Sequence, residues 1–327
     1  MLERAGRGDA RYPRANLFLG GDPVRLGGGS HVYELVPDWG RPPSGVSFGY
    51  THGVVVDSQD RVYVHNRSRD AVAVFDREGR FLGSWGEEFA GGAHGLFLSR
   101  EPGGEFLYLA DPERHLVAKA TLDGRILWRL GVPDLPEVYP TPDRYRPTDV
   151  CVAPNGDFYV GDGYGQSWVH QYDRDARYIR SWGGAGAEPG KLQCPHGLWV
   201  DTRAATPRLL VADRGNHRLQ AFTLDGRHMG FIQSELRLPC SLYQFGEELV
   251  VPDLHARVTI LDADDRHVCH LGDDSGAWER TGWPNIPAGQ RQPGRFIAPH
   301  AACVDSRGDL YVVEWVADER VSKLRRV

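Results

Sequence analysis

The sequence contains six copies of one short pattern, and this repeat constrains the fold more than any other feature. Each copy has an anchor residue followed by short apolar runs that end at Gly, Asp or Asn. Such runs are typical of β-strands joined by tight turns. The clearest copy occupies residues 147–183. The six anchor residues are His52, His94, Asp149, His196, Cys240 and His300.

The spacing of the anchors indicates how the strands are grouped. Successive anchors are 42, 55, 47, 44 and 60 residues apart, close to the roughly 40–50 residues of a four-stranded propeller blade. Insertions at 132–146 and 273–295 account for two of the longer steps. We therefore predict an all-β fold, a six-bladed β-propeller, although a length of 327 residues would otherwise suggest two domains.

The two ends of the chain predict how the ring closes. The last copy of the repeat stops after its third strand, and an open ring would leave exposed strand edges. The segment 31–40 ends in Trp39-Gly40, as other copies end in Trp85-Gly86 and Trp182-Gly183. We expect this segment to pair with the last blade. Residues 31–327 then form one propeller, and residues 1–30 form a Gly-rich lead-in that is only partly ordered.

Net charge and composition limit the kinds of partner that the protein can bind. The net charge of −6 provides no basic field for nucleic acid, and no run approaches the roughly 18 apolar residues of a membrane helix. The first residues are charged and glycine-rich where a secretory signal would be apolar. Five widely spaced cysteines suggest neither a disulfide framework nor a thiolate zinc site. We expect a cytoplasmic protein that acts on a small molecule, with its oligomeric state open.

Four of the six anchors are histidines: His52, His94, His196 and His300. The first strand of each propeller blade lines the central channel, so these imidazoles should converge there. They could simply hydrogen-bond across a wet channel. Neutral imidazole is also the commonest protein nitrogen ligand, and three such ligands with an open position are typical of catalytic zinc. We predict a divalent metal ion in the channel, with zinc as the expected ion.

The ends of the second strands present a second set of candidates. Acidic or amide residues recur there, and turn capping explains them most simply. The residues just beyond them include Arg67, Arg214, Tyr164 and His255. These loops open on the face where the histidines lie, so an arginine could hold a carboxylate or oxyanion. Tyr164 is the candidate base, because a nearby cation can lower the pKa of a phenol. His255 is a reserve acid or base.

These residues resemble a known family. The repeat is similar to NHL repeats, and residues 94–300 resemble the catalytic domain of peptidyl-α-hydroxyglycine α-amidating lyase. The most specific matching segments are Pro147-Thr-Asp-Val150, Gly161-Asp-Gly-Tyr164, Trp182-Gly183, Pro195-His196 and Ala212-Asp-Arg214. The resemblance implies a six-bladed propeller with a zinc ion held by His94, His196 and His300. It also implies a catalytic tyrosine at Tyr164 and active-site arginines at Arg214 and Arg67.

The implied reaction is the collapse of a carbinolamide into glyoxylate and an amide. Metal would polarise the hydroxyl, Tyr164 would take its proton, and an arginine would hold the carboxylate. The chain also departs from the family. Ala298 and Ala301 replace a methionine and an acidic calcium ligand, so a structural calcium is doubtful. The family's disulfide cysteines are absent. His52 is an additional channel histidine and a possible fourth ligand.

Two further hypotheses remain beside a metal-dependent lyase or hydrolase. A non-catalytic NHL scaffold would bind a protein or ligand on one propeller face, and fold alone cannot exclude it. Such a scaffold has no need for converging histidines below Tyr164 and Arg214. A lactonase-type hydrolase would require an acidic metal set. Asp149 is the only acid among the six anchors, so we rank this hypothesis below the lyase.

Overall fold

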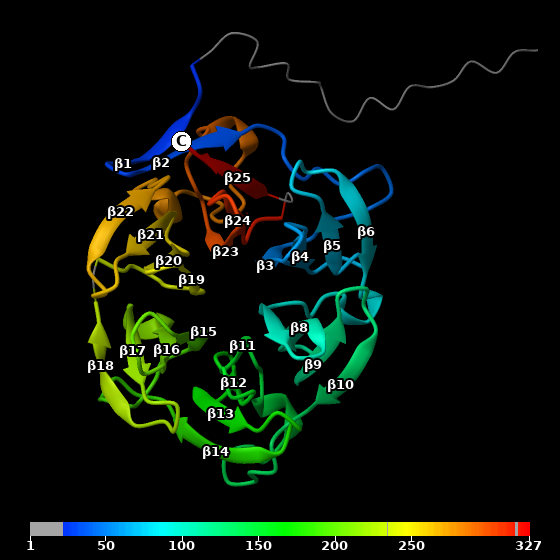
Figure 1. Ribbon diagram of the computed structural model, residues 1–327, viewed down its shortest axis with the longest axis vertical. Helices are drawn as coiled ribbons and strands as arrows, with labels where there is room; N and C mark the ends of the chain where they lie inside the picture. Colours follow the sequence, from blue (N-terminus) through cyan, green and yellow to red (C-terminus); the bar gives the residue numbers. More distant parts are fainter. Residues whose placement is uncertain (1–21, 234, 318–319) are drawn as a thin grey trace, which may run out of the picture.

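The computed structural model describes residues 22–233, 235–317 and 320–327. Over these residues the chain forms six antiparallel sheets arranged as blades around a central channel (Figure 1). The predicted six-bladed all-β propeller is confirmed. The first strands of neighbouring blades contact one another around the channel. None of the described helices is long and apolar enough to cross a bilayer.

Blades one to three are four-stranded meanders. Blade one contains β3 (Thr51–Val56), β4 (Val62–Asn66), β5 (Val72–Phe75) and β6 (Phe81–Trp85). Blade two contains β7 (Leu96–Glu101), β8 (Gly104–Asp111), β9 (Leu116–Thr121) and β10 (Ile126–Leu130). Blade three contains β11 (Asp149–Val152), β12 (Phe158–Gly161), β13 (Trp168–Tyr172) and β14 (Tyr178–Gly183).

Blades four and five repeat this order. Blade four contains β15 (Pro195–Asp201), β16 (Arg208–Asp213), β17 (Arg218–Phe222) and β18 (His228–Ile232). Blade five contains β19 (Tyr243–Phe245), β20 (Glu248–Asp253), β21 (Arg257–Leu261) and β22 (His267–Leu271). Short 3-10 helices lie between strands, at Glu87–Phe89, Pro142–Arg144, Arg214–Asn216, Ala277–Glu279 and Ala288–Gln290.

The sixth blade joins the two ends of the chain. Its C-terminal strands are β23 (Pro299–Val304), β24 (Leu310–Glu314) and β25 (Val321–Arg326). The strand β2 (His31–Val36) pairs antiparallel with β25, which confirms the predicted ring closure. Figure 1 shows the blue N-terminal strands beside the red C-terminal one.

A fifth strand in this blade was not foreseen. The strand β1 (Arg25–Gly28) pairs with β2, inside the segment expected to be a partly ordered lead-in. Leu26 is buried in the apolar cluster that also contains Tyr33 of β2. The domain boundary at residue 30 stays a prediction, and residues 1–21 of the lead-in lie outside the described residues.

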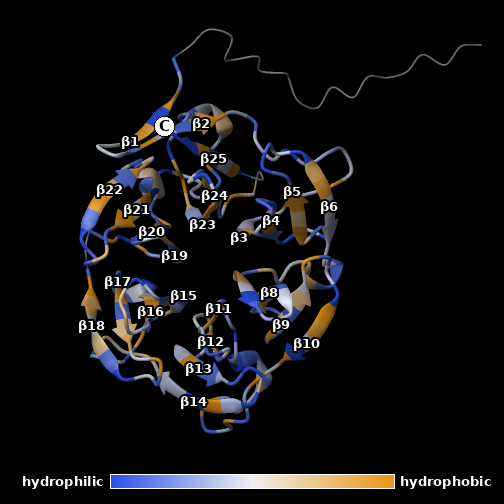
Figure 2. Cartoon of the chain, viewed as in Figure 1, coloured by the Kyte–Doolittle hydropathy of each residue, from blue (hydrophilic) through white to orange (hydrophobic). Residues whose placement is uncertain are grey.

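The apolar core lies between the blades. Inner strands such as β3 and β4 are buried along their whole length, whereas the outer strand β14 is largely exposed. Strands buried on both faces read as continuous apolar runs, which explains their sequence pattern. An apolar cluster lies between each pair of neighbouring blades. Hydrophobic segments accordingly recur along the strands of every blade (Figure 2).

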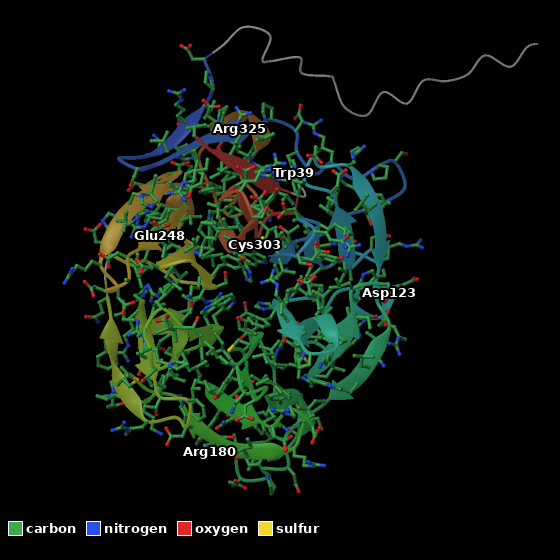
Figure 3. All side chains as sticks on the ribbon, viewed as in Figure 1. Trp39, Asp123, Arg180, Glu248, Cys303 and Arg325 are labelled. Atoms are coloured by element: carbon green, nitrogen blue, oxygen red, sulfur yellow. The ribbon has the colours of Figure 1, made fainter. Side chains whose placement is uncertain are left out.

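A tryptophan from the segment that precedes blade one adds to the contacts between blades. Trp39 is buried, with its ring centroid 5.6 Å from that of Phe75 in blade one and 4.9 Å from that of Tyr311 in blade six. Figure 3 shows Cys303 toward the centre, and Asp123 and Arg180 at the outer edge.

The buried acids at the ends of the second strands cap loops, which confirms their predicted role. Asp213 accepts a hydrogen bond from the backbone N–H of Gln193 at 2.6 Å, and Asp253 accepts one from Leu238 at 2.9 Å. Glu314 does the same for Ile297 at 2.6 Å. Each carboxylate therefore holds the loop that leads into the first strand of its own blade.

Candidate active site

Strand register brings the anchor residues and the second-strand loops to one end of the channel. In β15 and β16, Pro195 pairs with Asp213, so His196 lies beside the loop that carries Arg214. Thr51 pairs with Asn66 in the same way, and His52 lies beside Arg67. In blade three the anchor Asp149 pairs with Gly161, next to the loop of Tyr164.

Glycines allow these segments to approach one another closely. A Cβ atom on Gly163 would lie 2.6 Å from the carbonyl oxygen of Pro195, which leaves no room for a side chain beside Tyr164. A Cβ atom on Gly197 would lie 2.4 Å from the carbonyl oxygen of Cys240. The glycine that follows a channel histidine therefore lets the next blade pack against it.

The four predicted histidines converge in the channel. The ring centroids of His94, His196 and His300 are 4.8–4.9 Å apart. The His52 centroid is 4.9 Å from that of His94 and 4.7 Å from that of His300. All four side chains are buried. Their convergence was predicted from sequence, whereas their binding of a metal stays a prediction.

Backbone carbonyls orient the imidazoles. The Nδ1 atom of His94 lies 2.6 Å from the carbonyl oxygen of Thr148, and that of His196 lies 2.8 Å from the carbonyl oxygen of Cys240. The Nδ1 atom of His300 lies 2.7 Å from the carbonyl oxygen of His52. A carbonyl can only accept, so Nδ1 carries the hydrogen and Nε2 keeps its lone pair, as in metal-binding histidines.

His52 is held differently. Its Nδ1 atom lies 3.0 Å from the carbonyl oxygen of Tyr50 in its own segment, not from one in the next blade. Its ring nitrogen nevertheless groups with those of His94 and His300, with the three ligand atoms within 4.8 Å of one another. His52 is therefore positioned as an alternative ligand in the channel.

Burial keeps these imidazoles neutral. It lowers the pKa of all four histidines, and the charge of Arg67, of Arg214 or of both lowers it further. Neighbouring imidazoles also lower the pKa of His52, His94 and His196. The pKa of His300 falls to about 3. Neutral imidazoles have free lone pairs near pH 7, which suits metal binding.

Tyr164 lies directly against this set. Its hydroxyl oxygen is 3.1 Å from Nε2 of His94 and 3.0 Å from Nε2 of His196. Removal of the hydroxyl from water raises the pKa of Tyr164, and the charge of Arg214 acts in the opposite direction. The phenol is therefore protonated near pH 7, and its proton can be donated to only one of the two imidazoles.

Arg214 completes one side of the site. Its Cζ atom lies 5.4 Å from the centre of the Tyr164 ring, within cation–π range. Its Nη2 atom lies 3.4 Å from Sγ of Cys194, and its Nη1 atom lies 3.8 Å from Sγ of Cys240. Sequence reasoning assigned no role to either cysteine, although Cys240 occupies an anchor position.

Arg67 lies on the opposite side of the histidines. Its charge lowers the pKa of His52, His94 and His300. Its Nε atom is buried and has no hydrogen-bond partner among the described residues. A buried donor of this kind is costly unless a ligand or water accepts from it, so Arg67 suits an anionic ligand.

His255 does not join the ring. It stacks on Trp278 of the 273–295 insertion, with ring centroids 4.7 Å apart and an interplanar angle of 13°. Its ring also meets the edge of Trp283 at 5.9 Å. Within the described parts of the chain it has no hydrogen bond or ring contact with the channel histidines. Its reserve role as an acid or base stays a prediction.

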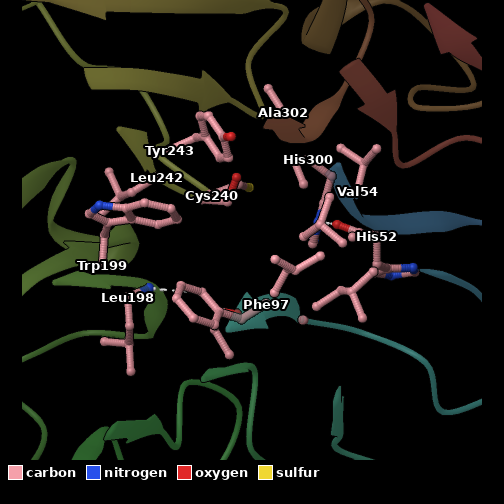
Figure 4. A pocket seen from close by; sticks show the side chains of 18 of the residues that line it. His52, Val54, Phe97, Leu198, Trp199, Cys240, Leu242, Tyr243, His300 and Ala302 are labelled. Atoms are coloured by element: carbon pink, nitrogen blue, oxygen red, sulfur yellow. Dashed lines mark hydrogen bonds between the residues drawn. The ribbon is translucent and has the colours of Figure 1, made fainter. Parts of the chain in front are cut away.

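A cavity of about 140 Å³ lies in the channel, with the histidines among its lining residues. The rings of Phe97, Trp199 and Tyr243 gather around it, together with Cys240 and His300 (Figure 4). The anchor Asp149 also lines the cavity, and burial raises its pKa to about 7. Its carboxylate accepts a hydrogen bond from the N–H of Leu198 at 2.9 Å.

A second cluster lies away from the channel. Glu235, His267 and His270 bring three ligand atoms within 4.8 Å of one another near the outer strand β22. However, Nη1 of Arg257 lies 3.1 Å from Nε2 of His270, so a guanidinium already occupies the position of a cation. The channel set is the stronger candidate for a metal.

A family model, the NHL repeat, matches residues 145–172, which include the loop of Tyr164. The chain is therefore a six-bladed propeller with histidines in its channel, and one stretch of it matches the NHL repeat.

The sequence of this chain is similar to those of two known proteins. It is 32% identical to NHL repeat-containing protein 3 of Mus musculus over 199 residues, which are 58% of this chain and 56% of the relative. It is 30% identical to peptidyl-alpha-hydroxyglycine alpha-amidating lyase 1 of Drosophila melanogaster over 169 residues, which are 48% of this chain and 30% of that one. The matches thus span about half or less of these relatives' length. The resemblance drawn from the sequence is confirmed.

Solved structures resemble the fold more broadly. A gluconolactonase from Xanthomonas campestris has a TM-score of 0.62 at 14% identity, and the match covers 94% of this chain and 95% of that one. At such low identity the likeness concerns the fold alone.

Proposed function

We propose that this protein is a metal-dependent lyase, or a hydrolase, that cleaves a C–N or C–O bond of a small hydroxylated, anionic substrate in the channel. One observation carries the proposal: the hydroxyl of Tyr164 lies within 3.1 Å of Nε2 atoms from two different blades, in a group of four buried imidazoles. The homology to peptidyl-α-hydroxyglycine lyases supports the same reaction type.

The residues present fit a divalent metal ion. The close groups of ligand atoms in the channel are His52, His94 and His300 and, separately, His196, Cys240 and His300, so the proposed set of His94, His196 and His300 draws on both groups. His94, His196 and His300 each have Nδ1 tied to a carbonyl, so their Nε2 lone pairs are available as ligands. His52 is an additional ligand candidate. Zinc is the ion that we propose, because it favours imidazole ligands with an open position. Such an ion would polarise the substrate hydroxyl and lower its pKa.

The chain's own residues supply the remaining chemistry. The phenol of Tyr164 is protonated without a metal, but a bound dication would lower its pKa, and the phenolate would then accept the hydroxyl proton. Arg214 and Arg67 hold the substrate carboxylate from two sides. In the lyase reaction the hydroxyl carbon becomes the carbonyl of a two-carbon aldehyde acid as its C–N bond breaks. The departing amide nitrogen takes up a proton, which Tyr164 can return. No water is consumed, so the reaction is balanced.

The second candidate function is a non-catalytic binding scaffold. It is favoured by the similarity to NHL repeat-containing protein 3, whose name assigns no reaction. The two functions differ at the channel, because a scaffold that binds through its outer face does not require buried neutral imidazoles beside a tyrosine and two arginines.

Metal content is the measurement that separates these functions. Wild-type protein should contain about one metal ion per chain, and a variant with His94→Ala, His196→Ala and His300→Ala should contain none. The single variant His196→Ala should also lose metal and turnover while remaining folded by circular dichroism. His228→Ala is the control, because His228 lies on the outer strand β18 and its loss should leave metal content unchanged.

Turnover completes the test. Metal-loaded wild type should cleave α-hydroxyglycine derivatives or related α-hydroxy compounds. A wild-type protein that retains no metal after reconstitution would exclude this mechanism and favour the scaffold. The cytoplasmic location and the small-molecule partner also stay predictions, which cell fractionation and substrate screening would check.

A further inference from the structure

The thiol of Cys240 lies among the channel histidines. Its Sγ atom forms a group with ring nitrogens of His196 and His300 in which all ligand atoms are within 4.8 Å of one another. Cys240 occupies in blade five the anchor position that four other blades fill with histidine. Figure 4 shows it facing the same cavity as His300.

The backbone of Cys240 is held rigidly. Its N–H donates to the carbonyl oxygen of Pro252 at 2.9 Å, and its own carbonyl oxygen accepts from Nδ1 of His196 at 2.8 Å. The same residue therefore orients one imidazole and presents its sulfur beside that imidazole. This preorganisation is what a metal ligand requires.

Charge balance distinguishes Cys240 from the other lining groups. The four imidazoles are neutral ligands, and the guanidinium groups of Arg67 and Arg214 lie close enough to lower imidazole pKa values. A dication held only by neutral ligands between two such cations would be electrostatically unfavourable in a buried channel. One anionic ligand reduces this cost.

Two residues could supply that negative charge. The carboxylate of Asp149 already accepts a hydrogen bond from Leu198 and belongs to none of the metal-compatible groups found among the described residues. Cys240 belongs to one, and Nη1 of Arg214 lies 3.8 Å from its sulfur. Burial raises the pKa of the Cys240 thiol to about 11, and the charge of Arg214 acts in the opposite direction. A bound metal ion would favour loss of the thiol proton.

We propose that Cys240 is a ligand of the channel metal, which it binds through sulfur together with His196 and His300. The inference deepens the proposed function, on whose metal it rests, and assigns the site a mixed imidazole and thiolate character. The thiol proton is released to solvent as the sulfur binds. Such a ligand set selects zinc or another thiophilic ion over harder cations that prefer oxygen ligands.

Cobalt substitution tests this inference directly. Full-length protein is stripped with chelator and loaded with Co²⁺. Wild type should show a thiolate-to-cobalt charge-transfer band in the near ultraviolet in addition to visible d–d bands. Cys240→Ser should lose the charge-transfer band, and its Zn²⁺ affinity should fall at least about 10-fold, since even loss of an outer hydrogen-bond partner costs about 10–100-fold.

Cys194→Ser is the matched control. Cys194 also contacts Arg214, at 3.4 Å, but belongs to none of the metal-compatible groups of described residues. This variant should keep the charge-transfer band. A Cys240→Ser protein that keeps the band, or a Cys194→Ser protein that loses it, would overturn the assignment.

The possible failures are distinguishable. Co²⁺ bound to wild type with d–d bands alone overturns the thiolate ligand and leaves the proposed metal-dependent function standing. Absence of Co²⁺ binding overturns both. If Cys240→Ser does not fold, X-ray absorption at the zinc edge of the wild-type protein decides the question, because one sulfur at about 2.3 Å is expected and a purely nitrogen and oxygen environment contradicts the inference.

Discussion

The proposed chemistry of the candidate site depends on one atom, the hydroxyl oxygen of Tyr164. It lies 3.1 Å and 3.0 Å from the Nε2 atoms of His94 and His196, while its ring packs against the guanidinium of Arg214 at 5.4 Å. Removal of this oxygen leaves the ring, and hence most of the packing, in place. The chemistry and the architecture of the site can therefore be separated experimentally.

We expect Tyr164→Phe to retain metal and lose turnover. The variant keeps the three imidazoles but removes the proton acceptor, and general acid or base groups contribute about 10²–10⁴-fold to rates. Metal analysis and turnover on the same sample measure the two effects. Tyr178→Phe is the control, because Tyr178 is exposed on the outer strand β14. Unchanged turnover in Tyr164→Phe would exclude the tyrosine as the base.

A buried histidine outside the channel predicts a pH dependence of stability. The Nε2 atom of His170 lies 2.7 Å from the hydroxyl oxygen of Tyr139, and its Nδ1 atom lies 2.6 Å from that of Ser181. Burial lowers the pKa of His170 to about 3. The unfolded chain takes up this proton near pH 6.5, so the contribution is fully present above pH 6.5 and lost as the pH falls toward 3. The slope reaches about 1.4 kcal/mol per pH unit.

The comparison with His170→Gln isolates this effect. Burial raises the pKa of Asp162, linked to His170 through Tyr139, to about 6, so that carboxyl contributes a slope of opposite sign between about pH 6 and 3.8. Both proteins retain it. Urea unfolding between pH 7 and 4 should show a weaker loss of stability on acidification in His170→Gln, and parallel curves would contradict a neutral His170.

At the scale of single elements, the strand β2 determines whether the ring is closed. It lies between β1 and β25, and Tyr33 at its centre is 4% exposed in an apolar cluster shared by blades five and six. Its backbone pairs with Arg326 of β25. The strand therefore contributes both hydrogen bonds and buried apolar surface.

Tyr33→Ala should lower the free energy of unfolding by about 3 kcal/mol, because deletion of a large buried aromatic side chain leaves a cavity. Denaturant unfolding measures this loss. Val327→Ala is a control in an adjacent segment, since Val327 is 56% exposed and its truncation should change stability by less than about 0.5 kcal/mol. Equal effects of the two variants would show that β2 does not close the ring through packing.

In the whole molecule, buried ion pairs and hydrogen bonds add to the apolar contacts where blades one and six meet and the ring closes. The Nε atom of Arg77 in blade one lies 2.8 Å from Asp305, and its Nη2 atom lies 3.0 Å from Asp309, both in blade six. These side chains are nearly fully buried. The carbonyl oxygen of Arg77 also accepts from Nε1 of Trp39 at 2.9 Å.

Arg77→Ala should destabilise the propeller by about 3 kcal/mol, because the buried carboxylate of Asp305 loses its ion pair with Arg77, whereas Asp309 keeps Lys323 at 3.2 Å. The change is measured as a lowered Tm and a lowered free energy of unfolding. Arg80→Ala is the control, since Arg80 pairs with Asp76 at an exposed position and such pairs contribute about 0–1 kcal/mol. A similar Tm in both variants would contradict the role of Arg77 in ring closure.

The six blades, the closing strand β2 and the convergence of the channel histidines could all be predicted from the amino-acid sequence. Each of these features follows from residue types that recur at one position of the repeat. Because every repeat folds into the same blade, equivalent sequence positions come to equivalent positions around the channel. The strand β1 carries no such pattern. Its residues include Gly27 and Gly28, and it is ordered by pairing with β2 and by the burial of Leu26.

The directions of side chains on loops and at the non-histidine anchors could not be predicted, because they depend on tertiary contacts. His255 occupies the position equivalent to Tyr164, yet it stacks on Trp278 from a separate insertion, a contact that no local pattern encodes. The sulfur of Cys240 lies within 4.8 Å of ring nitrogens of His196 and His300 and 3.8 Å from Nη1 of Arg214. These residues come from three blades that adjoin at the channel. Repeats determine backbone positions, whereas the partners of a side chain depend on residues distant in sequence that only the closed ring brings together.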